Sequence, residues 1–212
     1  SFKSSGYTTG MVGKWHNGAL DPRFHPNARG FDEFIGFRGG WADYYKWNLD
    51  RNGSSEKSDG RYLTDVLAEE AVGFISRHSN EQFFLMITWN APHSPLQAPE
   101  DITQKYVDAG FDLGIAVIYA MIEVMDSGIG KVRQALDSAG IADDTILMFT
   151  SDNGPAFTHR EDQISSGMSV NERRFNCGFA GAKASVYEGG IRVPMIAKWA
   201  NGLPMDIDIN EQ

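Results

Sequence analysis

The 212 residues carry 19 basic and 28 acidic side chains, which gives a formal charge of −9 at neutral pH. An apolar fraction of 42% is typical of a globular domain and argues against general disorder. The acidic balance is a poor match for nucleic acid, so we expect no nucleic-acid partner, although a local positive site could still hold one small anion.

The ends of the chain and its single cysteine say little about compartment. Cys177 cannot form an internal disulfide, and we expect it to be a small buried or half-buried side chain. No stretch resembles the roughly 18 apolar residues that cross a bilayer, so we expect no transmembrane segment. The chain opens with Ser1 and not with a start methionine, so we expect the natural N-terminus to lie upstream.

Two amphipathic helices are predicted from apolar residues at helical spacing. The first covers residues 61–78, with Ser58 or Asp59 as its N-cap. The second covers residues 112–138 and ends before Gly140. Its predicted buried face consists of six residues: Ile118, Ile122, Met125, Ile129, Val132 and Leu136.

Three strands are predicted between and after these helices, at residues 82–89, 145–150 and 191–199. The first two are continuous apolar runs, which are typical of strands buried on both faces. Pro194 marks an edge, a bend or a strand end in the third. Buried strands that alternate with helices predict an α/β domain with a mostly parallel sheet flanked by helices. Ligands of such sheets bind beyond the carboxyl ends of the strands, so the residues that follow each strand are the candidates for a site.

Asp152 and Asn153 follow the predicted strand 145–150 on a turn that ends at Gly154 and Pro155. Two adjacent hard-oxygen side chains suit Ca²⁺ or Mg²⁺ better than zinc. The alternative is an Asx turn, in which both side chains only bond nearby backbone amides.

His93 follows the predicted strand 82–89, between Pro92 and Pro95 in a stiff extended loop. A histidine held in this way could donate a hydrogen bond to an anion or to a leaving group. The alternative is a structural histidine that bonds a neighbouring carbonyl.

Lys14, His16 and Lys183 are the remaining candidates for contacts to an anion. Lys14 and His16 would point to the same face of an extended segment, because side chains alternate there with a period of two. The alternative is a solvated Lys14 and a His16 that caps local structure. Lys183 sits among small residues that permit close backbone approach and could supply a cation to an oxyanion, although a lone lysine is usually on the surface.

Together and in this order, these segments resemble the sulfatase family of the alkaline-phosphatase-like superfamily. The resemblance covers nearly the whole chain, and we interpret residues 1–212 as a partial sulfatase catalytic domain. It is carried by Gly6-Tyr7-x-Thr9 with Gly13-Lys14-Trp15-His16, Arg29-Gly30-Phe31-Asp32-Glu33-Phe34, Ala91-Pro92-His93-Ser94-Pro95 with Gln97-Ala98-Pro99, Ser151-Asp152-Asn153-Gly154, and Lys183 with Tyr187-Glu188-Gly189-Gly190-Ile191-Arg192-Val193-Pro194.

The resemblance implies sulfuric ester hydrolysis at a site shared by these segments. It implies that Asp152 and Asn153 ligate a divalent cation, usually Ca²⁺ with Mg²⁺ possible. It also implies that Lys14 and His16 lie toward the nucleophile and the sulfate, with His93 and Lys183 toward the leaving oxygen. A metal, two ammonium groups and histidine donors can stabilise the charge that develops as the S–O bond breaks.

Some features of the family are absent from these 212 residues. The family's nucleophile is a formylglycine made from Cys or Ser in a Cys/Ser-x-Pro-Ser-Arg motif, which we do not find, and Cys177 lacks the required neighbours. Two further acidic metal ligands and the smaller C-terminal domain are also missing. Ala184 stands where the family often has glycine, and Ala200 where proline is common. We therefore expect a fragment of a longer enzyme that alone binds metal weakly and turns over little or nothing, and family habit suggests a periplasmic or secreted parent.

The substrate is the least defined part of this interpretation. Residues 39–47 are rich in aromatics, which could stack on a sugar ring or an aryl group, or could simply belong to the core. We expect a sulfated carbohydrate, with an aryl sulfate as the alternative. Two other functions stay open, namely a phosphate or phosphonate ester hydrolase of the same superfamily and a non-catalytic sulfate-binding relic.

Overall fold

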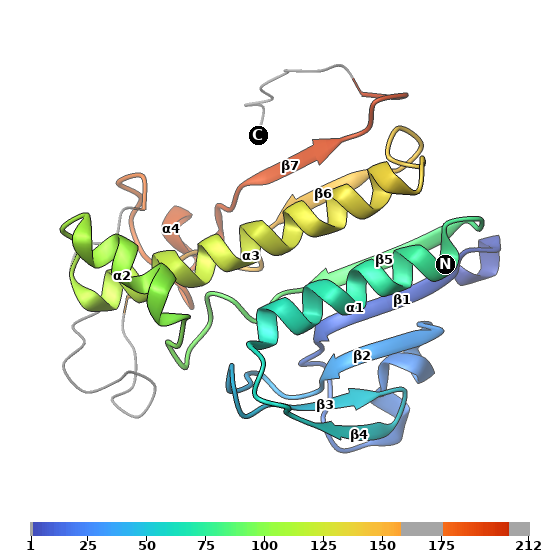
Figure 1. Ribbon diagram of the computed structural model, residues 1–212, viewed down its shortest axis with the longest axis horizontal. Helices are drawn as coiled ribbons and strands as arrows, with labels where there is room; N and C mark the ends of the chain where they lie inside the picture. The colour runs from blue at the N-terminus through green and yellow to red at the C-terminus, as the bar shows by residue number, and fades with distance from the viewer. Residues whose placement is uncertain (1, 158–175, 204–212) are drawn as a thin grey trace. The chain divides into compact units, whose positions relative to one another are not determined.

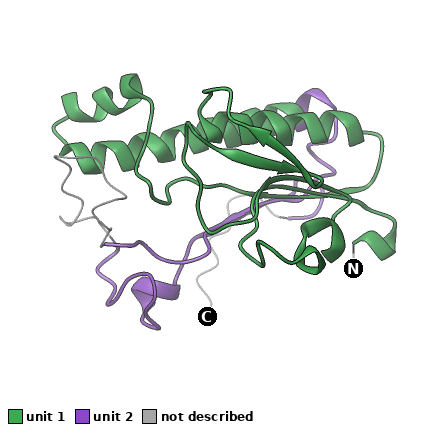
Figure 2. Cartoon of the chain, turned by 90° about the horizontal axis from the view of Figure 1, so that it is seen from below, with its two compact units in different colours: residues 1–135, 160–169 green, residues 136–159, 170–212 purple. Residues whose placement is uncertain are grey.

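The computed structural model describes residues 2–157 and 176–203, which divide into two compact units (Figures 1 and 2). Unit 1 holds residues 2–135, and unit 2 holds residues 136–157 together with residues 176–203. The predicted site residues Lys14, His16 and His93 belong to unit 1. Asp152, Asn153 and Lys183 belong to unit 2.

Unit 1 is built on a five-stranded mixed sheet (Figure 1). In sheet order its strands are β4 (Ser54–Lys57), β3 (Asn48–Arg51), β2 (Glu33–Phe37), β1 (Thr8–Lys14) and β5 (Phe83–Thr88). β1 pairs in parallel with both β2 and β5, whereas β3 is antiparallel to β2 and to β4. The α/β prediction is confirmed, with a mixed sheet whose parallel part is the three strands β2, β1 and β5 at one side of the sheet.

Helix α1 (Leu63–His78) covers one face of this sheet and packs on β1, β2 and β5. Gly10 of β1 lies under the ring of Phe74, which a Cβ added at Gly10 would approach to 2.3 Å. The predicted helix 61–78 is confirmed with a start two residues later, but its predicted cap is wrong. Asp59 bonds the backbone N–H of Arg61 at 3.0 Å, in a turn before the helix, and Tyr62 is the N-cap residue.

Three short 3₁₀ helices complete the β1–β2 region: η1 (Lys3–Ser5), η2 (Pro22–Phe24) and η3 (Pro26–Arg29). His25, between η2 and η3, packs edge-on against Phe34 of β2 with ring centroids 5.6 Å apart. Thr9 of β1 joins the start of β2, because its backbone N–H donates to the Asp32 carboxylate at 3.0 Å and its hydroxyl lies 2.8 Å from the same oxygen. These hydrogen bonds connect the Gly6-Tyr7-x-Thr9 segment with the segment 29–34 that contains Asp32.

The chain then forms α2 (Glu100–Asp108) and the long helix α3 (Leu113–Ser138). The predicted helix 112–138 is confirmed, but its predicted buried face is partly wrong, since Ile122 is 39% exposed. The buried stripe instead includes small residues, and Gly128 faces Trp89, which a Cβ there would approach to 2.9 Å. Small residues such as Gly128 let α3 approach the Trp89 ring closely. Such residues do not appear in a pattern of large apolar side chains. The buried residues of α3 in unit 1 are Gly114, Ile115, Ala116, Val117, Ile118, Ala120, Met121, Val124, Gly128 and Val132.

Helix α3 is also long and apolar enough to cross a membrane, judged by length and composition alone. This corrects the expectation that no segment reaches that threshold. Half of its most apolar window is buried inside the structure, and Lys131 of the same helix bonds Asp65 of α1 at 2.8 Å. The core helix of a soluble protein passes the same test, so this is weak evidence for a membrane span.

The parallel strands β1 and β2 approach most closely where both carry glycine. A Cβ on Gly36 would lie 1.8 Å from the carbonyl oxygen of Gly13. A Cβ on Gly13, whose φ is +115°, would lie 2.0 Å from the carbonyl oxygen of Thr88 in β5. Both positions therefore require glycine, and together they fix the backbone spacing near the carboxyl ends of three strands.

Unit 2 contains β6 (Leu147–Thr150), β7 (Met195–Lys198) and the one-turn helix α4 (Glu188–Ile191). β6 and β7 pair antiparallel, with Leu147 opposite Lys198. The predicted strand 145–150 is confirmed over its last four residues. The predicted strand 191–199 is shorter than expected, because Ile191 ends α4 and Pro194 directly precedes β7.

The predicted burial of these strands on both faces is wrong. Met86 of β5 is 42% exposed, and Met148 of β6 is 58% exposed. β5 forms an edge of the five-stranded sheet, and β6 has a single partner strand among the described residues, so both have fewer neighbours to cover them. Cys177 is exposed rather than buried, with a positive φ of 58° in the loop before α4.

Candidate active site

The carboxyl end of β1 places Lys14 and His16. Lys14 is the last residue of the strand and is half-buried. The hydroxyl of Thr88 donates to its carbonyl oxygen at 2.6 Å, which joins this end of β1 to β5. His16 has a φ of +53°, so the extended alternation stops before it, and the prediction that Lys14 and His16 point to the same face has no basis in this backbone.

The imidazole of His16 packs against the backbone of the segment that follows β2. A Cβ on Gly40 would come within 2.7 Å of its Nε2 atom, so the ring lies directly against this glycine and would have to shift if a larger residue replaced it. His16 itself is exposed to solvent. Its ring therefore has a fixed backbone neighbour on one side and access to a ligand.

The loop after β5 begins with a buried asparagine. Asn90 is 2% exposed, and its Nδ2 atom donates to the carbonyl oxygen of Ala42 at 2.9 Å. Its Oδ1 atom is buried without a hydrogen-bond partner in the described part of the chain. Asn90 thus ties the His93 loop to residues 39–47, the same segment that contacts His16.

His93 is half-buried, and its own loop fixes the orientation of its ring. Nδ1 lies 2.7 Å from the carbonyl oxygen of Ser94, which can only accept, so Nδ1 carries a proton. The buried hydroxyl of Tyr44 donates to the carbonyl oxygen of His93 at 3.0 Å. The imidazole orientation is therefore set by its contact with the Ser94 carbonyl, and the loop position by the bond from Tyr44.

The charge states beneath this loop follow from burial and hydrogen bonding. Burial raises the pKa of the Tyr44 phenol well above its usual range, so it stays a neutral donor to the His93 loop. Burial also acts to raise the pKa of Asp43, but hydrogen bonds from Gln97 and from two backbone N–H groups outweigh it and lower that pKa. The amide of Gln97 donates to Asp43 at 2.9 Å and accepts from the Tyr44 backbone N–H at 2.8 Å.

Residues 39–47 are therefore both core and part of the site. Tyr44 and Trp47 are 0% and 3% exposed, which agrees with the interpretation of this aromatic stretch as core. Trp41 is 57% exposed and lies between the two backbone contacts just described, at Gly40 and Ala42. Within unit 1, this one segment contacts both the His16 ring and the His93 loop.

In unit 2, the Asp152 loop and the Lys183 loop are joined through the backbone. The backbone N–H of Lys183 donates to the carbonyl oxygen of Pro155 at 2.9 Å, and Gly154 donates to Gly190 at 2.9 Å. A Cβ on Gly154 would lie 1.9 Å from the carbonyl oxygen of Gly189. Glycines in both loops thus bring together two segments about thirty residues apart in sequence.

The Asp152 side chain is exposed and, within residues 2–157 and 176–203, makes no hydrogen bond or ion pair. The Nδ2 atom of Asn153 donates to the carbonyl oxygen of Gly154 at 2.8 Å, and Ser151 donates to the carbonyl oxygen of Asn153 at 3.0 Å. Neither side chain bonds a backbone amide, so the Asx-turn alternative is not what this loop forms. Lys183 is exposed, as a surface lysine or a ligand-binding lysine would be.

A cation at this loop would find only part of its ligand set here. Asp152 and Asn153 offer at most three side-chain oxygens, whereas Ca²⁺ takes six to eight. No group of three or more His, Cys, Asp or Glu side chains forms a metal cluster in the described ranges. The chemistry of the two donors fits Ca²⁺ or Mg²⁺, and further ligands would have to come from elsewhere.

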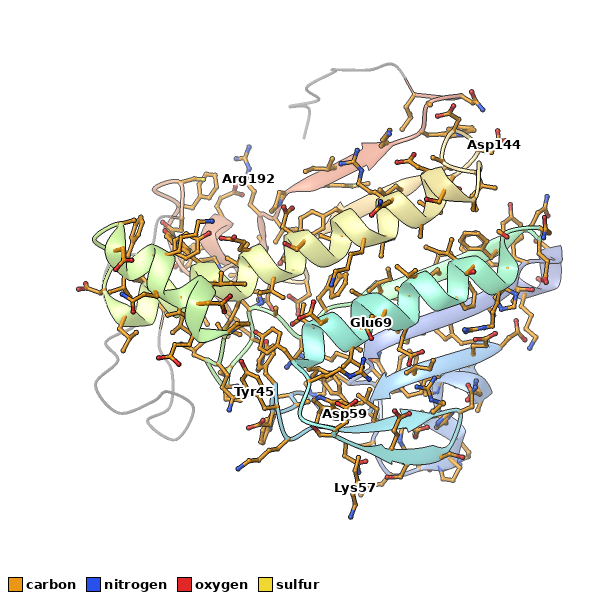
Figure 3. The ribbon with its side chains drawn as sticks, in the orientation of Figure 1. Tyr45, Lys57, Asp59, Glu69, Asp144 and Arg192 are labelled. Atoms are coloured by element: carbon orange, nitrogen blue, oxygen red, sulfur yellow. The ribbon has the colours of Figure 1, made fainter. Side chains whose placement is uncertain are left out.

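Two positions that the sequence analysis did not single out contact predicted site residues. Thr88 bonds the Lys14 carbonyl, and Gly40 lies against the His16 ring. Arg38, which directly follows β2, was also not singled out. The signal for Arg38 was the rule that ligands gather after parallel strands, but β2 was not recognised as a strand. Figure 3 labels Tyr45, which belongs to residues 39–47, and Arg192, which directly follows α4 and pairs with Glu188 at 3.2 Å.

Comparison with known proteins gives this arrangement a family. The family model described as Sulfatase matches residues 1–211. N-acetylgalactosamine-6-sulfatase of Homo sapiens is 31% identical over 93% of this chain, which spans 38% of the human protein. Arylsulfatase J of Mus musculus is also 31% identical, over 90% of this chain and 32% of that protein.

Solved structures agree with this match. The crystal structure of Ps i-CgsB in complex with k-i-k-neocarrahexaose superposes with a TM-score of 0.81 and 32% identity, over 96% of this chain and 47% of that one. The chain thus spans less than half the length of each of these relatives. It belongs to the sulfatase family, whose members use a metal cofactor, and it has the alkaline-phosphatase-like fold of that family.

Proposed function

We propose that the complete gene product that carries this chain hydrolyses sulfate esters of carbohydrates. The observation that carries the proposal is the contact of one segment, residues 39–47, with both the His16 ring and the His93 loop, at the carboxyl ends of parallel strands. The backbone coupling of the Asp152 and Lys183 loops adds a second pair of functional groups. Family membership supports sulfate as the group that is transferred.

Each residue has a role that its surroundings support. Lys14, held through its carbonyl by Thr88, and His16, seated on Gly40, bind the sulfate oxygens on the side of the nucleophile. His93 donates a proton from Nε2 to the leaving oxygen, since its Nδ1 atom is engaged with Ser94.

Lys183 stabilises charge on the leaving oxygen as an ammonium point charge. Asp152 and Asn153 hold a divalent cation, Ca²⁺ in our proposal and Mg²⁺ as the alternative, which supplies fixed positive charge to the ester oxygens. The nucleophile, a formylglycine in this family, lies outside these 212 residues in our proposal.

We propose a carbohydrate as the leaving group because the names of similar proteins contain carbohydrates. One relative is named for N-acetylgalactosamine 6-sulfate, and a similar structure carries a neocarrahexaose. When a sulfate ester of a sugar hydroxyl is cleaved, the sugar oxygen leaves as a poorly stabilised alkoxide unless it is protonated, so proton donation by His93 matters more than it does for an aryl sulfate.

A four-substrate panel tests the proposal with the complete gene product and added Ca²⁺. The panel contains 4-nitrophenyl sulfate, 4-nitrophenyl phosphate, N-acetylgalactosamine 6-sulfate and a carrageenan hexasaccharide. We expect hydrolysis of the sulfates and a much lower kcat/KM for the phosphate ester. A preference for the phosphate would favour the phosphatase alternative, and no turnover of any ester would favour the sulfate-binding relic.

Two variants separate metal binding from chemistry. Asp152→Ala should lower kcat/KM by about 10³-fold or more and weaken Ca²⁺ binding measured by calorimetry. Lys183→Ala should lower kcat by about 10²-fold and leave Ca²⁺ affinity unchanged. Asp143→Ala and Lys198→Ala, which change exposed residues of the same unit, are the matched controls. Wild-type rates in both test variants would remove these assignments.

A further inference from the structure

A polar pocket lies on the β2–β3–β4 part of unit 1, outside the residues assigned above. Its volume is about 220 Å³. The lining residues are Phe37, Arg38, Asn48, Leu49, Asp50, Gly53 and Ser55. The pocket is smaller than the roughly 300 to 1,000 Å³ that enclose a drug-sized ligand, so it suits one small unit of a larger molecule.

Asp50 organises the charges of this pocket. Its carboxylate lies 3.2 Å from Nε of Arg38 and 3.1 Å from Nε2 of His25, and its side chain is 16% exposed. The backbone N–H of Asn27 donates to Nδ1 of His25 at 3.2 Å, so in the neutral ring Nε2 carries the proton and donates to Asp50. The backbone N–H of Gly53 donates to the other carboxylate oxygen at 2.5 Å. Asp50 is thereby held in one orientation.

Hydrogen-bonding capacity remains for a ligand. The ion pair of Arg38 uses Nε, and its two Nη atoms make no hydrogen bond to any described residue. The hydroxyl of Ser55 donates to Oδ1 of Asn48 at 2.9 Å, which leaves the Asn48 amide N–H groups and the Ser55 oxygen facing solvent. Donors from two side chains thus lie beside hydroxyl and carboxylate acceptors.

This mixture favours a neutral polyhydroxy ligand over a bare anion. The Asp50 carboxylate offsets the guanidinium charge of Arg38, so the pair offers little net attraction to a second sulfate. Sugar hydroxyls both donate and accept, and neighbouring hydroxyls match a pocket in which donors and acceptors alternate. Phe37 and Leu49 line the pocket but are only 5% and 1% exposed, so the polar groups dominate its accessible surface.

The pocket begins next to the candidate sulfate site. Lys14 of β1 is in register with Phe37 of β2, and Arg38 is the next residue. Gly40, which seats the His16 ring, follows two residues later, so its Cα lies within about 7 Å of the Arg38 Cα. Trp41 comes next and is 57% exposed, which offers a face on which a sugar could stack.

We propose that the Arg38–Asn48–Asp50–Ser55 pocket is a subsite for an unsulfated sugar unit of an oligosaccharide whose neighbouring unit carries the sulfate. The proposal rests on the proposed function. It predicts that the protein prefers oligosaccharides to monosaccharide sulfates, because a monosaccharide leaves the pocket empty.

The experiment measures substrate preference in the complete gene product. The variants are Arg38→Ala and Asn48→Ala, and the control is Arg133→Ala, an exposed arginine of α3. For each, kcat/KM is measured with the carrageenan hexasaccharide and with 4-nitrophenyl sulfate. We expect the ratio of the two to fall at least tenfold for Arg38→Ala and about threefold for Asn48→Ala, through KM for the hexasaccharide. The control should keep the wild-type ratio.

A binding measurement keeps the subsite testable without turnover. The chemically desulfated hexasaccharide is titrated into each protein by calorimetry, and both test variants should bind it at least threefold more weakly than wild type. The subsite proposal is overturned if the ratio of the two kcat/KM values and the Kd for the desulfated hexasaccharide both stay at their wild-type values. It is also overturned if kcat/KM falls equally for both substrates. If the wild type hydrolyses no sulfate ester, the proposed function fails, while the desulfated probe still decides on the pocket. Asn48→Ala covers the case in which Arg38→Ala does not fold, because Asn48 is exposed on a short strand.

Discussion

The two units position their functional residues in different ways. In unit 1, Lys14 and His93 lie at the ends of parallel strands above a buried core, and side-chain hydrogen bonds from Thr88 and Tyr44 hold their backbones. In unit 2, the hydrogen bonds that join the Asp152 and Lys183 loops among the described residues are backbone ones, and the side chains of β6 and β7 are half-exposed or exposed. We infer that substitutions in unit 1 act on stability and activity together, whereas substitutions in unit 2 act locally on the Asp152 loop.

The difference between the units can be tested by replacing one closely packed glycine in each unit, Gly13 and Gly154, with alanine. Gly13→Ala should have the largest effect, because its Cβ would overlap the Thr88 carbonyl at 2.0 Å and its φ of +115° is unfavourable for alanine. We expect a loss of about 4 kcal/mol or more in the free energy of unfolding, measured with urea. Gly30→Ala is a control with positive φ but open space around it.

Gly154→Ala is the counterpart in unit 2. The added Cβ would lie 1.9 Å from the Gly189 carbonyl and would separate the Asp152 loop from the Lys183 loop. We expect Ca²⁺ affinity and kcat/KM to fall at least tenfold, with a loss in global unfolding free energy smaller than that of Gly13→Ala by about 2 kcal/mol. Equal global destabilisation by the two variants would contradict the local character of unit 2.

Thr88→Val tests whether stability and activity are linked in unit 1. The change keeps the shape of the side chain but removes the hydrogen bond to the Lys14 carbonyl. We expect a loss of about 1 kcal/mol in stability together with a several-fold fall in kcat. Thr145→Val, which removes a hydroxyl bonded to the Ile141 carbonyl in unit 2, should cost similar stability and leave kcat unchanged.

Asp32→Asn tests the pH dependence of the β1–β2 connection. The hydrogen bond from Lys3, followed by the Thr9 backbone N–H, lowers the pKa of Asp32 to about 2. A lowered pKa stabilises the fold above the unfolded value of 3.8, and this contribution is lost as the pH falls from about 4 toward 2. The variant should be about 1 kcal/mol less stable at pH 7, allowing for solvent screening. Denaturant unfolding should find this difference shrinking at pH 3, and a constant difference would sink the assignment.

The smallest effect is expected at Ala184, next to Lys183. Its φ is +72°, a conformation that glycine adopts without strain. Ala184→Gly relieves about 1 kcal/mol of strain but adds a similar entropy to the unfolded chain, so Tm should change by less than about 2 °C. A larger shift, measured by calorimetry, would mean that this loop is more tightly constrained than its exposure indicates.

The sequence was sufficient for the long helices and for the family, because both depend on strong local patterns. It was not sufficient for β1 to β4. β3 and β4 are short and polar, and their hairpin is signalled only by Asn52 and Gly53, which adopt φ values of +51° and +91°. Asn-Gly is a strong hairpin signal only where alternating apolar residues flank it, and the polar residues of β3 and β4 lack that pattern.

The contacts that position the site were beyond sequence reasoning for a different reason. Gly40 against His16, and Asn90 on the Ala42 carbonyl, join segments that are far apart in the chain. Neither glycine nor asparagine carries a periodic signal that could reveal such a partner. The proposed function predicts that the side chains of Asp152, Asn153 and Lys183 share one site with those of Lys14, His16 and His93.

The facing glycines of β1 and β2 constrain how this family member can diversify. Because Gly13 and Gly36 have no room for a side chain, the two strand ends cannot be reshaped by ordinary point substitutions. The residues that leave β2 are less restricted, since a Cβ on Gly39 would meet nothing nearer than 3.8 Å. Directed evolution of the proposed subsite should therefore begin after β2 and leave the paired glycines untouched.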